Sequence, residues 1–123
     1  MTPQEIFDKV STHLLNQNQR SVSFDSQGES YCAYRGNAGL TCAIGCLIED
    51  CEYHPNMENC TVKRLILENE FLAKKFGQNI DLLVALQRVH DEFEIFEWAN
   101  ELKNIASNFN LNFVPPSKHC AKQ

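Results

Sequence analysis

The sequence predicts a mainly α-helical fold with one small β-hairpin, an α+β class packed as a compact single domain of four to six helices. The length of 123 residues fits one domain. Apolar residues recur at helical spacing along most of the chain, and two short alternating runs with a polar turn between them occur at about 20–35. We therefore expect a single helical domain over 1–111 and a flexible C-terminal tail over 112–123.

The first helix is predicted at about 3–16. Thr2 can cap its start, with Pro3 at the first helical position and Glu5 completing a capping box. One apolar face follows, formed by Ile6, Phe7, Val10, Leu14 and Leu15. This face should pack against the rest of the domain.

The hairpin is predicted from the runs 21–24 and 30–34, which Gly28 and its polar neighbours separate. A two-stranded ribbon is only marginally stable alone, so we expect it to pack on the helices. After it, Arg35–Gly39 should form a tight loop, because glycine and asparagine accept positive φ angles.

The apolar stretch 40–48 fits either a buried strand or a helix. We favour a short buried helix with Thr41 as its cap, because Ala43 and Gly45 would allow close packing. A glycine inside a helix costs about 1 kcal/mol relative to alanine. Gly45 therefore predicts that a backbone segment or a ligand approaches closely there.

The second half of the chain is predicted to be helical after a loop over 50–60, which has one helical turn near Met57. Thr61 should cap a helix, a second short piece should stop at Gly77, and Asn79 should cap the next helix. The last helix carries the apolar stripe Ile95, Trp98, Ala99, Leu102, Ile105, Ala106 and Phe109. Cys120 should lie in the tail, apart from the other cysteines.

Composition narrows the range of partners. The formal net charge is −5 and no cluster of Lys and Arg occurs, so we expect no binding to duplex nucleic acid. No apolar run approaches the roughly 20 residues that cross a membrane, so we expect no membrane partner. The first residues lack the basic and apolar regions of a signal peptide, which predicts a cytoplasmic protein.

Five of the six cysteines lie between Cys32 and Cys60. In a reducing cytosol we expect them to be thiols, and small buried thiols pack as hydrophobic side chains. We therefore expect no cofactor. The alternative is zinc held by Cys32, Cys42, Cys46 and Cys51, although the spacings of nine, three and four intervening residues differ from those of paired zinc ligands.

The loop after the hairpin is the main functional candidate, as a site for a small anionic ligand such as a nucleotide. Small residues would let backbone N–H groups face the ligand, and a helix starting near Thr41 would add its positive end. Arg35 could hold a phosphate or carboxylate through two hydrogen bonds. The predicted binding residues are Tyr34, Arg35, Gly36, Asn37, Gly39, Thr41, Tyr53 and His90. A homo-oligomer would help so small a protein to enclose a ligand.

Two other function classes stay open. A cysteine-dependent hydrolase could use Cys42 at a helix start, with His90 and Asp91 beside it and Asp50 as an orienting group. No local signature of a cysteine hydrolase family is present, so an enzyme ranks below a binding protein. The third class is an inhibitor or adaptor that binds a host protein and has no small-molecule site.

Four segments carry a likeness to a known group. They are Cys32-Ala-Tyr-Arg-Gly, Cys42-Ala-Ile-Gly-Cys-Leu-Ile-Glu-Asp-Cys-Glu-Tyr53, Met57-Glu58 and Leu86-Gln-Arg-Val-His-Asp91. Together they resemble a group of small uncharacterised proteins from bacteria and their phages, over most of residues 3–111. The resemblance implies no activity or catalytic residue. It implies the cytoplasm of a bacterium or of an infected host cell, where a small acidic phage protein could sequester a nucleotide signal or bind a host factor.

Overall fold

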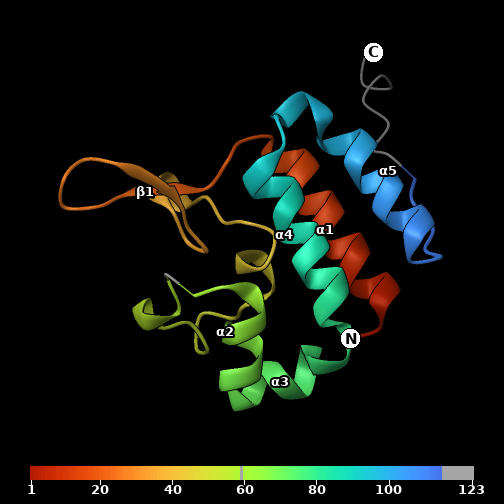
Figure 1. The fold of residues 1–123 in the computed structure, drawn as a ribbon, viewed down its shortest axis with the longest axis horizontal. Coiled ribbons are helices and arrows are strands. Elements are labelled where there is room, and N and C mark those ends of the chain that lie inside the picture. The colour runs from red at the N-terminus through yellow and green to blue at the C-terminus, as the bar shows by residue number, and fades with distance from the viewer. Residues whose placement is uncertain (59, 115–123) are drawn as a thin grey trace.

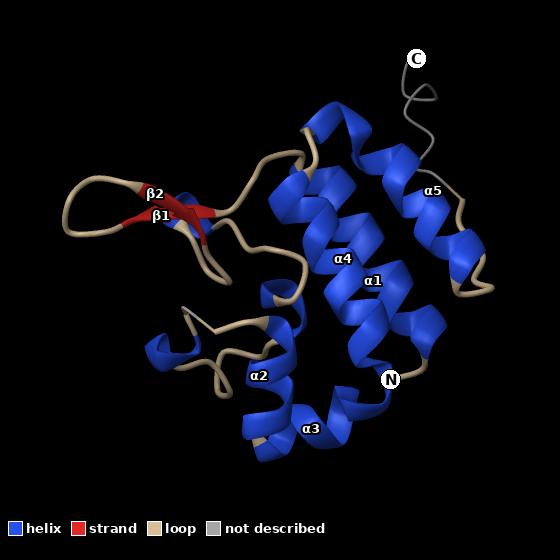
Figure 2. Cartoon of the chain, viewed as in Figure 1, coloured by secondary structure: helices blue, strands red, loops and turns tan. Residues whose placement is uncertain are grey.

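The computed structural model describes residues 1–58 and 60–114, and it confirms the α+β class (Figure 1, Figure 2). The helices are α1 (Pro3–Gln17), α2 (Val62–Glu68), α3 (Glu70–Phe76), α4 (Ile80–Glu92) and α5 (Trp98–Asn108). The strands β1 (Val22–Phe24) and β2 (Ser30–Cys32) form one antiparallel ribbon. This ribbon is the predicted hairpin.

The main apolar core lies between α1, α4 and α5, which run side by side (Figure 1). Phe7, Leu86 and Trp98, one from each of these helices, are fully buried. The indole N–H of Trp98 donates to the carbonyl oxygen of Phe93 at 3.2 Å, which satisfies its one polar group. α2 packs on α4, and α3 continues from α2. The helices thus form a packed base for the hairpin and the loop segments.

The first helix forms as predicted. The Thr2 hydroxyl accepts from the N–H of Glu5 at 3.1 Å, and the Glu5 carboxylate accepts from the N–H of Thr2 at 2.8 Å, so the capping box is complete. The helix ends because Asn18 adopts the left-handed conformation, with φ at 52°. Its N–H donates to the carbonyl oxygen of Leu14 at 2.8 Å.

The hairpin pairs Val22 with Cys32 and Phe24 with Ser30. One carboxylate oxygen of Asp25 accepts from the backbone N–H groups of the turn, and Gly28 takes a φ of 81° that glycine accepts without strain. The turn projects away from the helical body (Figure 2). The ribbon is therefore attached to the helices through its base.

The predicted helix over 40–48 is wrong. Thr41 is extended and pairs with Arg35 in an isolated antiparallel bridge, and only a 3₁₀ turn, Gly45–Leu47, follows. Ile48 is extended, so the turn does not continue into a helix, and side chains from other helices take the place of the predicted Thr41 cap. The N–H of Thr41 donates to the side-chain oxygen of Gln17 at 3.1 Å, and that of Ile44 donates to the side-chain oxygen of Gln87 at 3.1 Å.

The close approach expected at Gly45 is present. A Cβ atom added to this residue would lie 1.9 Å from the carbonyl oxygen of Tyr34. A backbone segment, rather than a ligand, therefore requires glycine at this position.

The second half follows the prediction closely. The Thr61 side chain accepts from the N–H of Arg64 and caps α2, and a 3₁₀ turn, Pro55–Met57, lies in the preceding loop. Asn79 differs, because its side chain makes no capping hydrogen bond. A 3₁₀ turn, Gly77–Asn79, instead leads directly into α4.

The C-terminal tail was predicted from residue 112. Asn112 and the side chain of Gln4 exchange two hydrogen bonds of 2.9 Å, and Phe113 packs edge-on against Phe7. The start of the tail is thus held on α1, whereas 115–123, with Cys120, lie outside the described residues. Among the described helices, none combines the length and the apolar character needed to cross a membrane.

Candidate functional site

The loop after the hairpin borders an open hollow of about 550 Å³, here called the Arg35 hollow. Its lining consists of Arg35, Gly36, Gly39, Leu40, Thr41, Gly45, Cys46, Ile48 and Asp50. Four of the predicted binding residues, Arg35, Gly36, Gly39 and Thr41, therefore meet at one hollow. Its volume is within the range of about 300–1,000 Å³ that small-molecule sites occupy.

The guanidinium group of Arg35 is held in place on two sides. Its Nη2 donates to the carbonyl oxygen of Ile48 at 3.1 Å, and its central carbon lies 4.4 Å from the centre of the Tyr53 ring. The same Nη2 lies 2.8 Å from the Asp50 carboxylate. The Arg35 side chain is 28% exposed, whereas that of Asp50 is 98% exposed. The Arg35 guanidinium is therefore fixed, whereas the Asp50 carboxylate beside it is exposed to solvent.

The Glu58 carboxylate fixes this arrangement through hydrogen bonds to the loop backbone and to Tyr53. It accepts from the N–H of Tyr34 at 3.0 Å and from the N–H of Arg35 at 3.1 Å. It also accepts from the Tyr53 hydroxyl at 2.7 Å. Burial and this bond to Glu58 raise the pKa of Tyr53 to about 12, so its ring stays neutral beneath the guanidinium. Glu58 lies 23 positions from Arg35 along the chain, so no local sequence pattern predicts this contact.

The backbone N–H groups of the loop do not form the predicted ring of free donors. The N–H of Gly36 donates to Leu40, and that of Leu40 donates to Asn37. The N–H of Thr41 is bound by Gln17. Thr41 does not begin a helix, so the positive helix end predicted at this residue is not formed. The Arg35 side chain is the one charged donor among the residues that line the hollow.

Three other predicted binding residues do not serve as walls of the hollow. Tyr34 is buried, and its hydroxyl donates to the carbonyl oxygen of Cys60. One face of Tyr53 is covered by Arg35. His90 is fully buried between α4 and α5, stacked on Trp98. Tyr34 and the covered face of Tyr53 are therefore unavailable to stack on a nucleobase.

The geometry required of a nucleophile is not met at Cys42. The residue is fully buried, and its sulfur accepts from the N–H of Gly45 at 3.3 Å. Burial strongly raises the pKa of the Cys42 thiol, against a smaller opposing effect of that hydrogen bond. A buried, protonated thiol neither contacts a substrate nor attacks it.

His90 and Asp91 do lie together, as the hydrolase alternative requires, but the cysteine beside them is Cys32. The Nε2 atom of His90 accepts from the N–H of Ser21 at 2.8 Å, because a backbone N–H can only donate. Nδ1 therefore carries the ring proton and donates it to Asp91 at 2.7 Å. Neither nitrogen is free to take a proton from a thiol, so His90 does not act as a base here.

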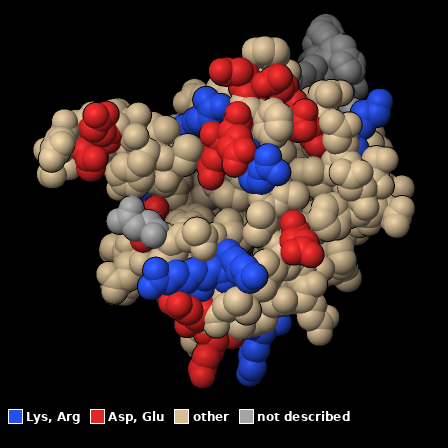
Figure 3. Space-filling view, viewed as in Figure 1, with Lys and Arg blue, Asp and Glu red and all other residues tan. Residues whose placement is uncertain are grey.

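Cys32 and Asp91 line a second pocket of about 230 Å³, between β2, the start of α2 and α4. On the face in Figure 3, the surface is hollowed where the hairpin meets the helices, with acidic side chains nearby. Burial, followed by the charge of Asp91 and a hydrogen bond to it, raises the pKa of Cys32 to about 11. A thiol with a raised pKa carries its proton at neutral pH, which makes Cys32 a poor nucleophile.

A metal ion does not fit the residues that come closest to forming a site. Among the described residues, the one such group is Cys32, His90 and Asp91, whose ligand atoms lie within 4.8 Å of one another. Binding through Nδ1 would move the His90 proton to Nε2, where it would meet the N–H of Ser21. The zinc set predicted from Cys32, Cys42, Cys46 and Cys51 does not assemble within the described part of the chain.

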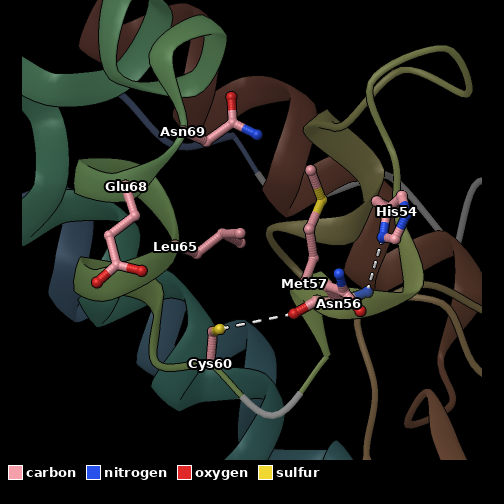
Figure 4. Close-up of a pocket in the computed structure, with 7 residues that line it drawn as sticks. All are labelled: His54, Asn56, Met57, Cys60, Leu65, Glu68 and Asn69. Atoms are coloured by element: carbon pink, nitrogen blue, oxygen red, sulfur yellow. Dashed lines mark hydrogen bonds between the residues drawn. The ribbon is translucent and has the colours of Figure 1, made fainter.

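A third pocket, of about 250 Å³, lies between α2 and the Pro55–Met57 turn (Figure 4). Leu65 and Met57 point into it from opposite sides. His54 is occupied in the turn, where its Nδ1 accepts from the N–H of Asn56 at 3.1 Å. Apolar side chains line part of this pocket, and its lining residues include no Lys or Arg. The Arg35 hollow is therefore the stronger candidate for an anion-binding site.

Comparisons with known proteins give the chain no relative from which a function could be carried over. No protein-family model, no curated protein and no solved structure matches it. The likeness to small bacterial and phage proteins stays a prediction. The functional proposal below therefore depends on the geometry of the site.

Proposed function

We propose that this protein binds a small anionic molecule in the Arg35 hollow and acts by capturing it rather than by converting it. The observation that carries the proposal is the state of Arg35. Its guanidinium is fixed by Tyr53 and Ile48, but its only ionic partner in the described residues is the exposed side chain of Asp50. Because the Arg35 guanidinium is already ordered and its ion pair with Asp50 is weak, a ligand anion can replace Asp50.

A ligand anion should bind Arg35 in preference to Asp50, because Asp50 contacts only one of the three guanidinium nitrogens. It meets only Nη2, and the described residues give Nε and Nη1 no hydrogen-bond partner. Exposed ion pairs of this kind contribute about 0–1 kcal/mol. A free carboxylate or phosphate that replaces Asp50 can form two parallel charge-assisted hydrogen bonds, which are stronger than the single contact.

Preorganisation adds to this preference. The stack on Tyr53 and the bond to Ile48 hold a side chain that would otherwise lose conformational freedom on binding. Ordering such a side chain costs about 0.5–1.5 kcal/mol. Glu58 restrains both the backbone of Arg35 and the Tyr53 hydroxyl, so this ordering is complete before a ligand arrives.

The test compares thermal unfolding with and without a panel of carboxylates, phosphates and nucleotides. A ligand at 100 times its dissociation constant adds about 2.7 kcal/mol, which raises the melting temperature of a domain this size by several degrees. We expect this shift in the natural protein and its loss in Arg35→Ala.

Two further variants make the result specific. Arg35→Lys keeps the charge but lacks the planar fork, and it should bind more weakly than the natural protein. Arg64→Ala removes an exposed arginine that pairs only with Glu68, four residues away, and should leave the shift unchanged. Equal shifts in Arg35→Ala and the natural protein, or no shift with any anion, would refute the proposal.

A further inference from the structure

We propose that the ligand of the Arg35 hollow is a small monocarboxylate with an aliphatic body. This inference rests on the proposed function and narrows the class of ligand. Three properties of the hollow support it: the single positive charge in its lining, the carboxylate that already sits on that charge, and the nature of its walls.

The charge of the hollow suits a singly charged anion. Arg35 is the one cation among its nine lining residues, and Asp50 brings a negative charge to the rim. Lys9 is near enough to influence Cys46 through its charge, but it does not line the hollow. A phosphate monoester carries about −1.5 to −2 at pH 7 and a nucleotide polyphosphate more, so each would leave charge without a partner. The net charge of −5 adds to the repulsion of such polyanions.

The one anion that contacts the Arg35 guanidinium is a carboxylate, that of Asp50, with its oxygen 2.8 Å from Nη2. It marks the position that a ligand carboxylate would take. The planar guanidinium matches a planar carboxylate with two parallel hydrogen bonds. Asp50 is thus a stand-in from the chain itself for the group that we propose the ligand carries.

The walls suit an aliphatic body and not a nucleobase. Leu40 and Ile48 are lining residues, and they give the hollow an aliphatic part. Burial raises the pKa of Cys46 to about 12, so its thiol is a neutral wall at physiological pH. No aromatic residue is among the residues that line this hollow. A ligand body here makes van der Waals contact rather than stacking.

The test measures dissociation constants for four probes by calorimetry: acetate, 3-methylbutanoate, inorganic phosphate and adenosine monophosphate. Each methylene buried on binding contributes about fourfold in affinity. We therefore expect 3-methylbutanoate to bind at least tenfold more tightly than acetate, and both phosphates to bind more weakly than 3-methylbutanoate.

The variant Leu40→Ala should reduce the preference for 3-methylbutanoate over acetate severalfold, while acetate binding stays unchanged. Leu67→Ala, which truncates an exposed leucine on α2, is the matched control and should retain the full preference. If the phosphates bind most tightly and this binding depends on Arg35, the monocarboxylate inference fails but anion binding stands. If no probe binds in a way that depends on Arg35, both fail.

Discussion

At the scale of single residues, the arrangement around Arg35 combines a strongly held cation with a weakly held anion. Glu58 and Tyr53 belong to the support, since they contact the backbone and the guanidinium face of Arg35. Asp50 belongs to the part that a ligand would replace. Substitutions can distinguish these two roles. Removing Glu58 or Tyr53 should weaken ligand binding, and removing Asp50 should strengthen it.

Asp50→Asn is therefore expected to increase affinity for a small carboxylate about two- to fivefold. The variant removes the charge that competes for Nη2, and an exposed pair is worth about 0–1 kcal/mol. Calorimetric titration with 3-methylbutanoate measures the change. Glu49→Gln removes a neighbouring exposed charge and is the control, with little expected effect. Weaker binding in Asp50→Asn would show that Asp50 assists the ligand instead of competing with it.

The sequence identified part of this site and missed the rest for a physical reason. Arg35 and the glycines are adjacent in the chain, so their loop was predictable from local rules. Glu58 reaches Arg35 across 23 residues, and nothing in the local sequence indicates which carboxylate will accept from two loop amides. The same applies to Cys32, which lies near His90 and Asp91 because the base of the hairpin is held on α4 by the hydrogen bond from the N–H of Ser21 to His90.

At the scale of elements, local signals predicted the helices and failed where tertiary partners replace local hydrogen bonds. The capping box of α1 and the Thr61 cap of α2 depend on residues three positions apart, and both are present. The stretch 40–48 depends instead on Gln17 and Gln87, which come from other helices. Apolar composition alone does not distinguish such a buried irregular segment from a buried helix.

The close contact between this segment and Tyr34 leads to a stability prediction. Gly45→Ala should lower the free energy of unfolding by about 2–4 kcal/mol, because its Cβ would overlap the backbone of Tyr34. Urea denaturation measures this change.

Gly77→Ala is the matched control for Gly45→Ala. Its added Cβ meets nothing within 4 Å and its φ is −59°, so it should be neutral or slightly stabilising. Equal effects of the two substitutions would mean that the 40–48 segment passes Tyr34 at a greater distance than the structure gives.

At the scale of the whole molecule, Cys42 and Cys46 contribute to the protein as neutral packing groups. The five described cysteines are free thiols, and burial raises the pKa of Cys32, Cys42 and Cys46. Cys42 lies in the same core as Tyr34 and Ile44. A fold that buries protonated thiols is stable only while those thiols keep their protons.

The free energy of unfolding should therefore fall as the pH rises above 9. The pKa of Cys42 lies well above its ordinary value of 9.0, so the thiol stays protonated in the folded protein and ionises in the unfolded chain. The unfolded state binds fewer protons, and stability declines with rising pH. At pH 10 this one thiol accounts for about 1 kcal/mol. Urea denaturation at pH 7, 9 and 10 measures the decline.

Cys42→Ala separates the effect of this thiol from other causes of alkaline unfolding. The variant should be less stable at pH 7, because it loses a buried sulfur, but its decline between pH 9 and 10 should be shallower by about the amount that Cys42 contributes. Cys51→Ala, at an exposed position, should keep the slope of the natural protein. If Cys42→Ala and the natural protein lose stability in parallel, the Cys42 thiol ionises in the folded state and the core around it admits a charge, contrary to its complete burial.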